Sequence, residues 1–431
     1  MQVVPTFSSP RSRWLFALAV CVVAPLVIAE FCWCVFHCDN DFLWHRFFGI
    51  AFLDDEVYET FGEHYLPARA MIDAATAWIP YRVDRVLWLL GTCAALAWCV
   101  RFWLHASGTQ ATDWRVPALI ALVAVSTYIH RDLAECGLQL FLLGLLTVGL
   151  WALVKGRPGL CGAALGLATV YKVTPAIFLP YLLWKRQWKA AGWTVAATAG
   201  FCLLPVLFLG WHRNAELHGK WLDFAIHAVT LDDPSQNGVE TPNLRNQSLP
   251  LLLARLVQDY PAGHPLHLDG PVLVHWAGLD AHTTKRVVQG ELLVLALAFA
   301  WRMRRAVKLP EDGASLADEW AVVCIFVALL SPLCWLQHLV LVLPASIIIA
   351  QRVATRRAPP WQLATAGVAA AFMLLVHRDL LGVAMCDLLS SFQPHAVASL
   401  LLAASVLGAP RPDRAAAQGA CIDRIAYRTA A

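Results

Sequence analysis

Residues 158–184 have the sequence PGLCGAALGLATVYKVTPAIFLPYLLW, an apolar run long enough to cross a membrane that carries one charged residue, Lys172. Basic clusters flank the run at both ends, Lys155 with Arg157 and Lys185 with Arg186. The positive-inside rule puts both clusters in the cytoplasm, so the run cannot cross only once. Because Pro175 removes a helix hydrogen bond near the middle, we predict a hairpin of two short helices that turns at Lys172 to Pro175.

The rest of the chain is similarly apolar. Its 431 residues are 59% hydrophobic and 15% charged, and the mean hydropathy of +0.57 exceeds what a soluble core requires. The formal net charge of +3 is too small to indicate a nucleic-acid partner, and the basic residues fall in short clusters between apolar runs. We therefore predict an all-α polytopic membrane protein, located in a bacterial inner membrane.

The basic clusters also predict the orientation. The first apolar run, Trp14 to Phe36, follows Arg11 and Arg13 and is too long for a signal-peptide core, so we expect a membrane helix with a cytoplasmic N-terminus. Cytoplasmic turns are predicted at residues 101–115, 155–157, 185–189, 302–308 and 352–357. This pattern predicts roughly 10 to 12 transmembrane helices in a single domain over residues 1–408, and a cytoplasmic tail over residues 409–431.

Two long polar segments, residues 37–84 and 211–285, are expected on the periplasmic side. The first combines acidic and aromatic residues, which suits amphipathic helices at the membrane surface. The thirteen cysteines lie mostly alone inside apolar runs, and no Cys/His spacing favours a metal site or a disulfide framework. We therefore look for chemistry where polar residues meet the outer ends of the helices.

Asp41, followed by Phe42 and the stretch 48–53, comes soon after the first predicted helix leaves the membrane. An ionised carboxylate at this place could act as a general base and take a proton from a sugar hydroxyl. The alternative is an interfacial Asp that caps a helix beside the membrane.

Two cations at outer helix ends are candidates for holding a phosphate. Arg131, in His130-Arg131-Asp132, either grips a phosphate or extends to the membrane surface and pairs with Asp132 or Glu135. Lys172 lies inside an apolar run, where an unpaired charge is costly. It is a functional candidate, and the alternative is a lysine that a neighbouring carboxylate neutralises to fix helix packing.

The second half of the chain adds three candidates. Asn246 and Gln247 begin an apolar stretch and carry amides that can hydrogen-bond sugar hydroxyls. His338 ends the short stretch from Ser331, which we expect to form a tight periplasmic turn between two apolar runs. Such a His either packs between helices or, beside an outward-facing cavity, donates to a phosphate oxygen.

In this order, these stretches resemble glycosyltransferase family 87, a group of bacterial membrane glycosyltransferases with the GT-C fold. The stretches that carry the resemblance are Asp41-Phe42, Gly49 to Leu53, Tyr65-Leu66-Pro67, Gly166-Leu167-Ala168, Lys172 to Pro175, Arg186 to Lys189, Asn246 to Leu249, and Leu330-Ser331-Pro332 with Trp335 and His338. They extend from about Asp41 to about Pro344. Two positions depart from the family pattern: Leu66 replaces a proline, and Leu140 stands where the family has Asn.

The resemblance implies transfer of a sugar, typically mannose, from a polyprenyl-phosphate donor to a glycolipid or polysaccharide acceptor at the periplasmic face. Asp41 would be the general base of an inverting displacement, and His338, Lys172 and Arg131 would hold the departing lipid phosphate. The polyprenyl chain would lie between helices in the bilayer, in contact with membrane lipids, so no nucleotide-sugar fold is needed. No cofactor is expected beyond the lipid-linked sugar, which is a substrate.

Two other classes remain open. A transporter or flippase would be expected to show internal repeats with paired broken helices, whereas the sequence shows one interrupted segment and no second copy. A non-catalytic scaffold gives no reason for Lys172 inside an apolar run. Consumption of a lipid-phosphate-sugar donor by membranes separates the enzyme from both.

Overall fold

The computed structural model describes residues 40–60, 65–108, 114–135, 137–231, 233–235, 245–261, 263–268, 276–305, 307, 309 and 312–408, with four isolated positions before residue 40. Within these ranges every regular element is a helix, and the only β-contact is an isolated bridge between Gln258 and Leu279. The all-α prediction is therefore confirmed for the described residues. The predicted first helix lies almost entirely outside them, and the predicted tail over residues 409–431 lies wholly outside.

The first half of the chain forms α2 (Asn40–Leu53), α3 (Val57–Thr60), α4 (Pro67–Ala77), α5 (Tyr81–Ala106), α6 (Arg115–Ala124), α7 (Ser126–Ala134), α8 (Leu138–Val154), α9 (Pro158–Tyr171), η1 (Thr174–Ile177), α10 (Phe178–Trp184) and α11 (Trp188–Leu203). The second half forms α12 (Val206–Thr230), α13 (Leu249–Val257), η2 (Pro265–Leu268), α14 (Ala281–Arg302), α15 (Gly313–Leu329), η3 (Leu336–Val342), α16 (Leu343–Ala354), α17 (Pro360–Leu375), α18 (Arg378–Ser390) and α19 (Pro394–Gly408). The two polar segments predicted as loops thus contain helices of their own, α2 to α4 and α12 to α13.

Two continuous helices in the described residues are long and apolar enough to cross a membrane, α5 and the run from η3 through α16. Three bent pairs, α6 with α7, α11 with α12 and α17 with α18, raise the number to as many as five if each pair is one span. Shorter apolar helices include α8, α9 and α19. These helices make a membrane protein, and the larger count of ten to twelve spans stays a prediction.

The predicted break near the middle of residues 158–184 is confirmed. α9 ends at Tyr171, Lys172 is extended with φ −150° and ψ 130°, and η1 starts at Thr174. Gly162 lies against Trp193 and Gly166 against Ala197, so α9 and α11 run parallel. Parallel neighbours require η1 and α10 to return to the starting side, which makes the segment a hairpin. The two glycines, four residues apart, permit this close helix contact because a Cβ at either would clash.

Four of the five predicted cytoplasmic turns fall where one helix gives way to the next, whereas residues 101–106 of the first predicted turn are the end of α5. Contacts bring two of the turns together. Lys185 Nζ, in the turn before α11, donates to the backbone oxygens of Met303 and Arg305, which follow α14. One exception concerns Lys185 itself, which the sequence places in a basic surface cluster. It is 1% exposed and paired with Glu319 at 2.5 Å.

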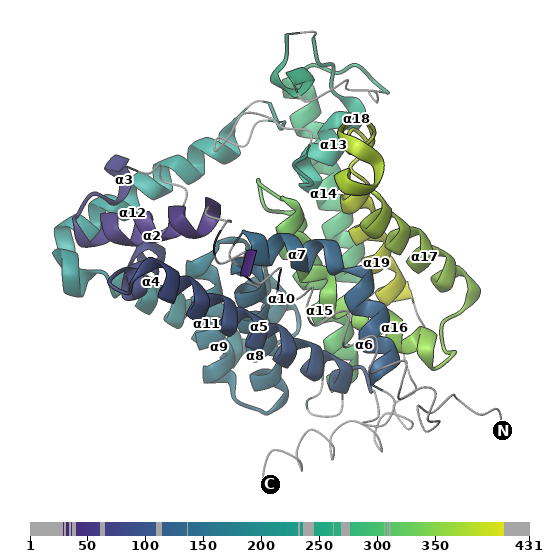
Figure 1. Cartoon of the computed structure of the whole chain (residues 1–431), viewed down its shortest axis with the longest axis horizontal. Coiled ribbons are helices and arrows are strands. Elements are labelled where there is room, and N and C mark those ends of the chain that lie inside the picture. The colour runs from purple at the N-terminus through teal and green to yellow at the C-terminus, as the bar shows by residue number, and fades with distance from the viewer. Residues whose placement is uncertain are drawn as a thin grey trace.

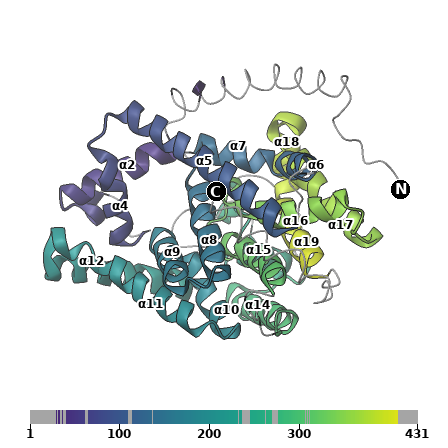
Figure 2. The same cartoon turned by 90° about the horizontal axis from the view of Figure 1, so that it is seen from below.

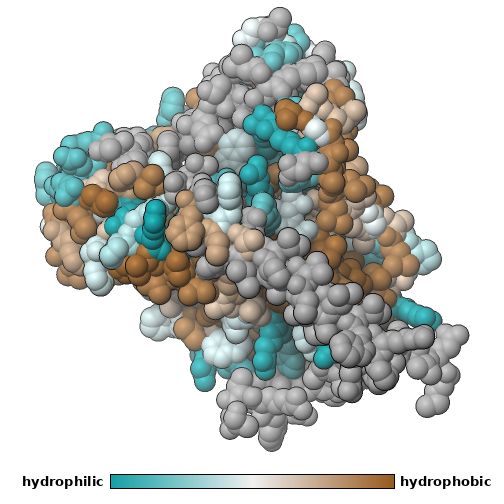
Figure 3. All heavy atoms as spheres, viewed as in Figure 1, coloured by the Kyte–Doolittle hydropathy of each residue, from teal (hydrophilic) through white to brown (hydrophobic). Residues whose placement is uncertain are grey.

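The apolar core has two main parts. The larger core joins helices of the bundle, with α8 packed against α5 and α9 (Figures 1 and 2). A smaller core, which we call the satellite core, is formed by α2, α3, α4 and α12 at the left of Figure 1. It comprises Phe48, Phe52, Val57, Tyr58, Ala70, Ala74 and Leu217. Broad apolar areas also remain exposed on the left and right of the molecule in Figure 3, with hydrophilic side chains at its top, at its upper left and between them. Exposed apolar areas of this extent suit a protein that lies in a membrane.

Candidate active site

Asp41 lies where the two cores meet. It is in the first turn of α2 and half-buried. The next residue, Phe42, belongs to the bundle core and packs against Tyr81, with ring centroids 5.7 Å apart, whereas the later turns of α2 pack in the satellite core. Electrostatic interactions link Asp41 to Asp132 and Lys172 of the bundle. The helix therefore brings a carboxylate from one unit to charged groups of the other.

Lys172 occupies the turn of the α9–η1 hairpin. Its backbone N–H still donates to Ala168 O at 2.9 Å, and the chain then leaves the helix. The ammonium interacts electrostatically with Cys334, Asp132 and Asp41, yet it forms no ion pair within 4.0 Å with any described residue. Its three donors are thus available near the predicted base.

The His130-Arg131-Asp132 trio is split by the structure. The side chain of Arg131 is exposed, whereas Asp132 is 1% exposed and points inward. Asp132 Oδ1 accepts from the backbone N–H of Gln139 at 3.0 Å and Oδ2 from that of Leu140 at 2.9 Å. Asp132 therefore caps the N-terminus of α8 and faces Lys172, while a phosphate-binding role for Arg131 stays a prediction.

Asn246 and Gln247 lie deep in the protein and bind its own backbone. Asn246 Nδ2 donates to Pro332 O at 2.8 Å, and its Oδ1 accepts from the backbone N–H of Cys334 at 2.9 Å. Gln247 Oε1 accepts from Ala396 N–H at 3.3 Å. The bonds of Asn246 shape the turn at residues 331–335, which precedes His338, and the bond of Gln247 joins that residue to the start of α19. The structure places both residues beside the turn that precedes His338. Their contact with a sugar stays a prediction.

His338 is the third residue of η3, the helical run that follows this turn. Its Nδ1 lies 2.9 Å from Leu333 O and 3.3 Å from Trp335 N. The shorter contact to a carbonyl assigns the hydrogen to Nδ1, which then donates to Leu333 O. Nε2 of the neutral ring is an acceptor, so His338 donates to a phosphate oxygen only as an imidazolium. The ring also interacts with the charge of Lys172.

A buried charged cluster on α2 and α4 was not identified from the sequence. Arg69 Nε lies 2.9 and 3.0 Å from the two carboxylate oxygens of Asp73, and Arg69 Nη2 lies 3.2 Å from His45 Nδ1. The guanidinium stacks 3.5 Å from the ring centroid of Tyr171 and donates to Tyr171 O at 3.4 Å. Arg69 thus connects the satellite core to the residue before Lys172.

The electrostatics of this cluster favour one fixed charge state. Burial lowers the pKa of His45 below 6.5, and the charge of Arg69 lowers it further, so His45 is neutral at pH 7 and accepts from Arg69. Burial by itself raises the pKa of Asp73, but the charge of Arg69 opposes it, and the pKa lies below its usual value. A signal existed in the sequence: Arg69 and Asp73 are four residues apart in the alanine-rich stretch 67–77.

The described residues contain no group of three or more His, Cys, Asp or Glu side chains able to hold a metal ion. What the site offers is a half-buried carboxylate and an imidazole that each interact with an ammonium, which forms no ion pair with a described residue, at the turn of an apolar hairpin. Such a set suits proton removal next to a departing anion.

Comparison with known proteins identifies the class. The model of glycosyltransferase family 87 matches residues 64–332, more than half of the chain. The chain belongs to this family of glycosyltransferases, and the predicted resemblance is confirmed.

The relatives are mannosyltransferases. A polyprenol-phosphate-mannose-dependent alpha-(1-2)-phosphatidylinositol mannoside mannosyltransferase of Mycolicibacterium smegmatis is 28% identical over 325 residues, 71% of this chain and 66% of the relative. An enzyme of the same name from Mycobacterium tuberculosis is 31% identical over 192 residues, 44% of this chain and 36% of the relative. A Mycobacterium tuberculosis pentamannoside mannosyltransferase is 27% identical over 288 residues, 66% of this chain and 57% of the relative. The chain thus matches less than two thirds of each relative's length, and no solved structure matches it.

Proposed function

We propose that the protein transfers a mannosyl residue from a polyprenyl-phosphate donor to a glycolipid acceptor at the periplasmic face of the inner membrane. The observation that carries this proposal is the grouping of Asp41, Lys172 and His338 at one junction, in a member of a glycosyltransferase family. The relatives' names support mannose and a lipid-linked donor. Their acceptors are phosphatidylinositol mannosides by name, which supports a glycolipid acceptor.

In the proposed reaction, the oxygen of an acceptor hydroxyl forms a bond to C1 of the sugar. The bond from C1 to the phosphate oxygen breaks, and its electron pair leaves with the polyprenyl phosphate. The hydroxyl proton moves to Asp41, which must be ionised beforehand. Attack opposite the leaving phosphate inverts the configuration at C1.

The surroundings of the site support these roles. Negative charge grows on the leaving phosphate, and the available ammonium of Lys172 and a protonated His338 would stabilise it more in the transition state than in the ground state. Asp132 is already bound by two backbone N–H groups of α8. Asp41 is the other carboxylate that interacts with Lys172, and it is half-buried where Asp132 is fully buried, which supports Asp41 as the base.

The test uses purified protein in liposomes supplied with polyprenyl-phosphate-mannose and phosphatidylinositol mannosides. The wild type should release polyprenyl phosphate and yield a glycolipid heavier by one hexose. Asp41→Asn keeps the side-chain shape but removes the basic oxygen, so transfer should fall ~100- to 10,000-fold while donor binding persists. Mass spectrometry of the products and a separate donor-binding measurement report the two effects.

Asp54 provides the matched control, because it is an exposed carboxylate just beyond the far end of α2. Asp54→Asn should transfer mannose at the wild-type rate. Transfer by Asp41→Asn at near-normal rate would remove Asp41 from the mechanism. Passage of the donor across the bilayer without its consumption would favour the transporter over the enzyme.

A further inference from the structure

The helix α12 lies across the direction of the bundle helices. The axes of Trp188–Leu203 and Val206–Ala228 differ by 97°, with the break at Leu204 and Pro205. A second irregularity follows at Gly210, whose φ of 75° only glycine adopts easily. α11 packs parallel to α9 inside the apolar bundle, so if α11 runs along the membrane normal, α12 lies nearly in the membrane plane.

After Gly210, the side chains of α12 fall on three faces at helical spacing. The face toward α2 and α4 carries Asn214, Leu217 and Trp221, which are buried or partly buried. A charged face carries His212, Arg213, Glu216, Lys220, Asp223 and His227. The third face is apolar and exposed, with Trp211 at 68%, Leu222 at 51% and Ile226 at 50%. This third face is covered by no described residue, although it is as apolar as the face that packs.

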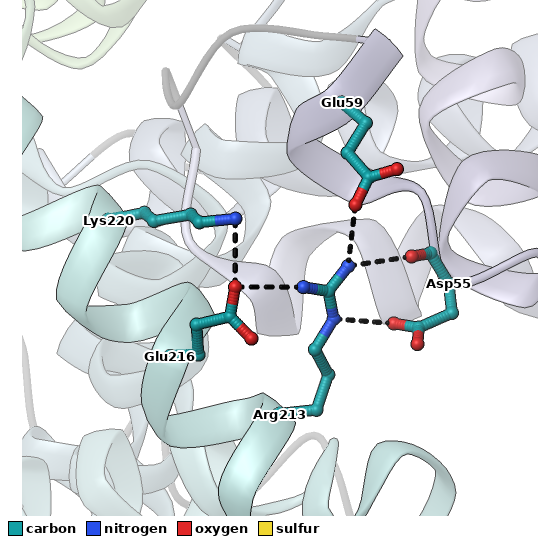
Figure 4. Close-up of polar contacts among 5 residues, drawn as sticks. All are labelled: Asp55, Glu59, Arg213, Glu216 and Lys220. Atoms are coloured by element: carbon teal, nitrogen blue, oxygen red, sulfur yellow. Dashed lines mark hydrogen bonds and ion pairs between the residues drawn. The ribbon is translucent and has the colours of Figure 1, made fainter.

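The charged face is tied to the end of α2 (Figure 4). Arg213 Nε donates to Asp55 Oδ1 at 2.8 Å, and Nη2 donates to Asp55 O at 2.8 Å and to Glu59 Oε1 at 3.3 Å. Arg213 Nη1 donates to Glu216 Oε1 at 3.0 Å, and Lys220 pairs with the same oxygen at 2.9 Å. We call these five residues the clasp. It joins α12 to the segment that follows α2, the helix whose first turn holds Asp41.

We propose that α12 is a membrane-surface helix. Its Trp211–Leu222–Ile226 face inserts at the boundary of headgroups and acyl chains, and the clasp fixes the depth of α2 relative to that boundary. The 97° bend gives the required direction, and the charged face beside the apolar one gives the pattern of an interfacial helix. An exposed Trp at one end of the apolar face suits the same depth. If a protein partner covered this apolar face instead, the 97° bend between α11 and α12 would have no such explanation.

The test places a fluorophore on single cysteines in the full-length protein, with the reactive native cysteines replaced. The protein is reconstituted in phosphatidylcholine–phosphatidylglycerol vesicles that contain phosphatidylcholine spin-labelled high on its acyl chain. Leu222→Cys and Ile226→Cys should be quenched at least about twofold more than the neighbouring Asp223→Cys and His227→Cys. Leu90→Cys, on the exposed face of the spanning helix α5, is the positive control.

Equal quenching at the four α12 positions would overturn the proposal. Protection of Leu222→Cys from lipid, together with a dimer by mass measurement, would show that a second copy covers the face and would overturn it as well. For the clasp, a spin label at Asp54→Cys should gain mobility when Arg213→Gln is added, and unchanged mobility would disprove the link to α2. None of these readouts depends on sugar transfer.

Discussion

The two ends of the α9–α10 hairpin each hold a lysine in apolar surroundings, and they use it in opposite ways. At the end near α11, Lys185 Nζ contacts Glu319 Oε2 at 2.5 Å and the backbone oxygens of Met303 and Arg305. At the turn of the hairpin, the ammonium of Lys172 has carboxylates nearby but no ion pair with a described residue. The three N–H donors of Lys185 are all used within the protein, whereas the ammonium of Lys172 forms no ion pair with a described residue.

The difference shows how to interpret a charge inside an apolar segment. Burying an ammonium in apolar surroundings costs free energy at both ends of the hairpin. At Lys185 the contacts that offset the cost come from the protein itself, which makes the pair structural. At Lys172 the protein supplies only partial compensation, and a negatively charged substrate would supply the rest. A leaving phosphate fits that requirement.

Among the variants that distinguish the two lysines, the largest loss of sugar transfer is expected at Lys172. Lys172→Gln keeps a polar side chain of similar length and removes the charge next to the departing phosphate, so transfer should fall on the order of 100- to 1,000-fold. The folded yield should stay close to that of the wild type, because no ion pair is lost. Product formation per folded molecule is the measurement, and a normal rate would make Lys172 as structural as Lys185.

A smaller loss is expected at His338, which stands beside Lys172. His338→Ala removes one donor to the phosphate and should lower turnover on the order of a hundredfold at equal protein level. Gln337→Ala, one residue before His338, is the control. Activity of His338→Ala within about twofold of the wild type would assign the ring to packing.

The sequence predicted the hairpin and its lysine because both depend on local rules. A proline and a charge in an apolar run, with basic residues at both ends, leave few possible topologies. Asp41 and His338 were singled out by their positions at the predicted outer ends of apolar runs, and the resemblance to the family added their roles. The interaction of each with Lys172 depends on long-range packing, which no local pattern contains.

The sequence alone did not predict which charged side chains are paired inside the protein. Lys185 was assigned to a surface cluster because its partner Glu319 is more than a hundred residues away. Asp132 appeared as a partner for Arg131, but the left-handed Gly137 lets the chain turn so that its carboxylate caps α8. Arg69 was overlooked because its contact with Tyr171 joins α4 to α9. Tertiary contacts decided the roles of Lys185 and Arg69, and the turn at Gly137 decided that of Asp132.

The smallest effect on transfer is expected at Lys185, where the consequence should be a loss of stability. Lys185→Met leaves the Glu319 carboxylate buried without its cation, and breaking a buried pair in this way typically costs about 3–5 kcal/mol. In detergent, thermal unfolding should therefore begin well below the wild-type temperature. Lys185→Met combined with Glu319→Gln removes both charges while the amide oxygen still accepts from the Tyr181 hydroxyl, which bonds Glu319 in the wild type. The double variant should regain most of the lost stability, and both variants should transfer mannose within about twofold of the wild-type rate per folded molecule. A large loss of transfer in the stable double variant would show that Lys185 also acts on the reaction, and the contrast between the two ends of the hairpin would then fail.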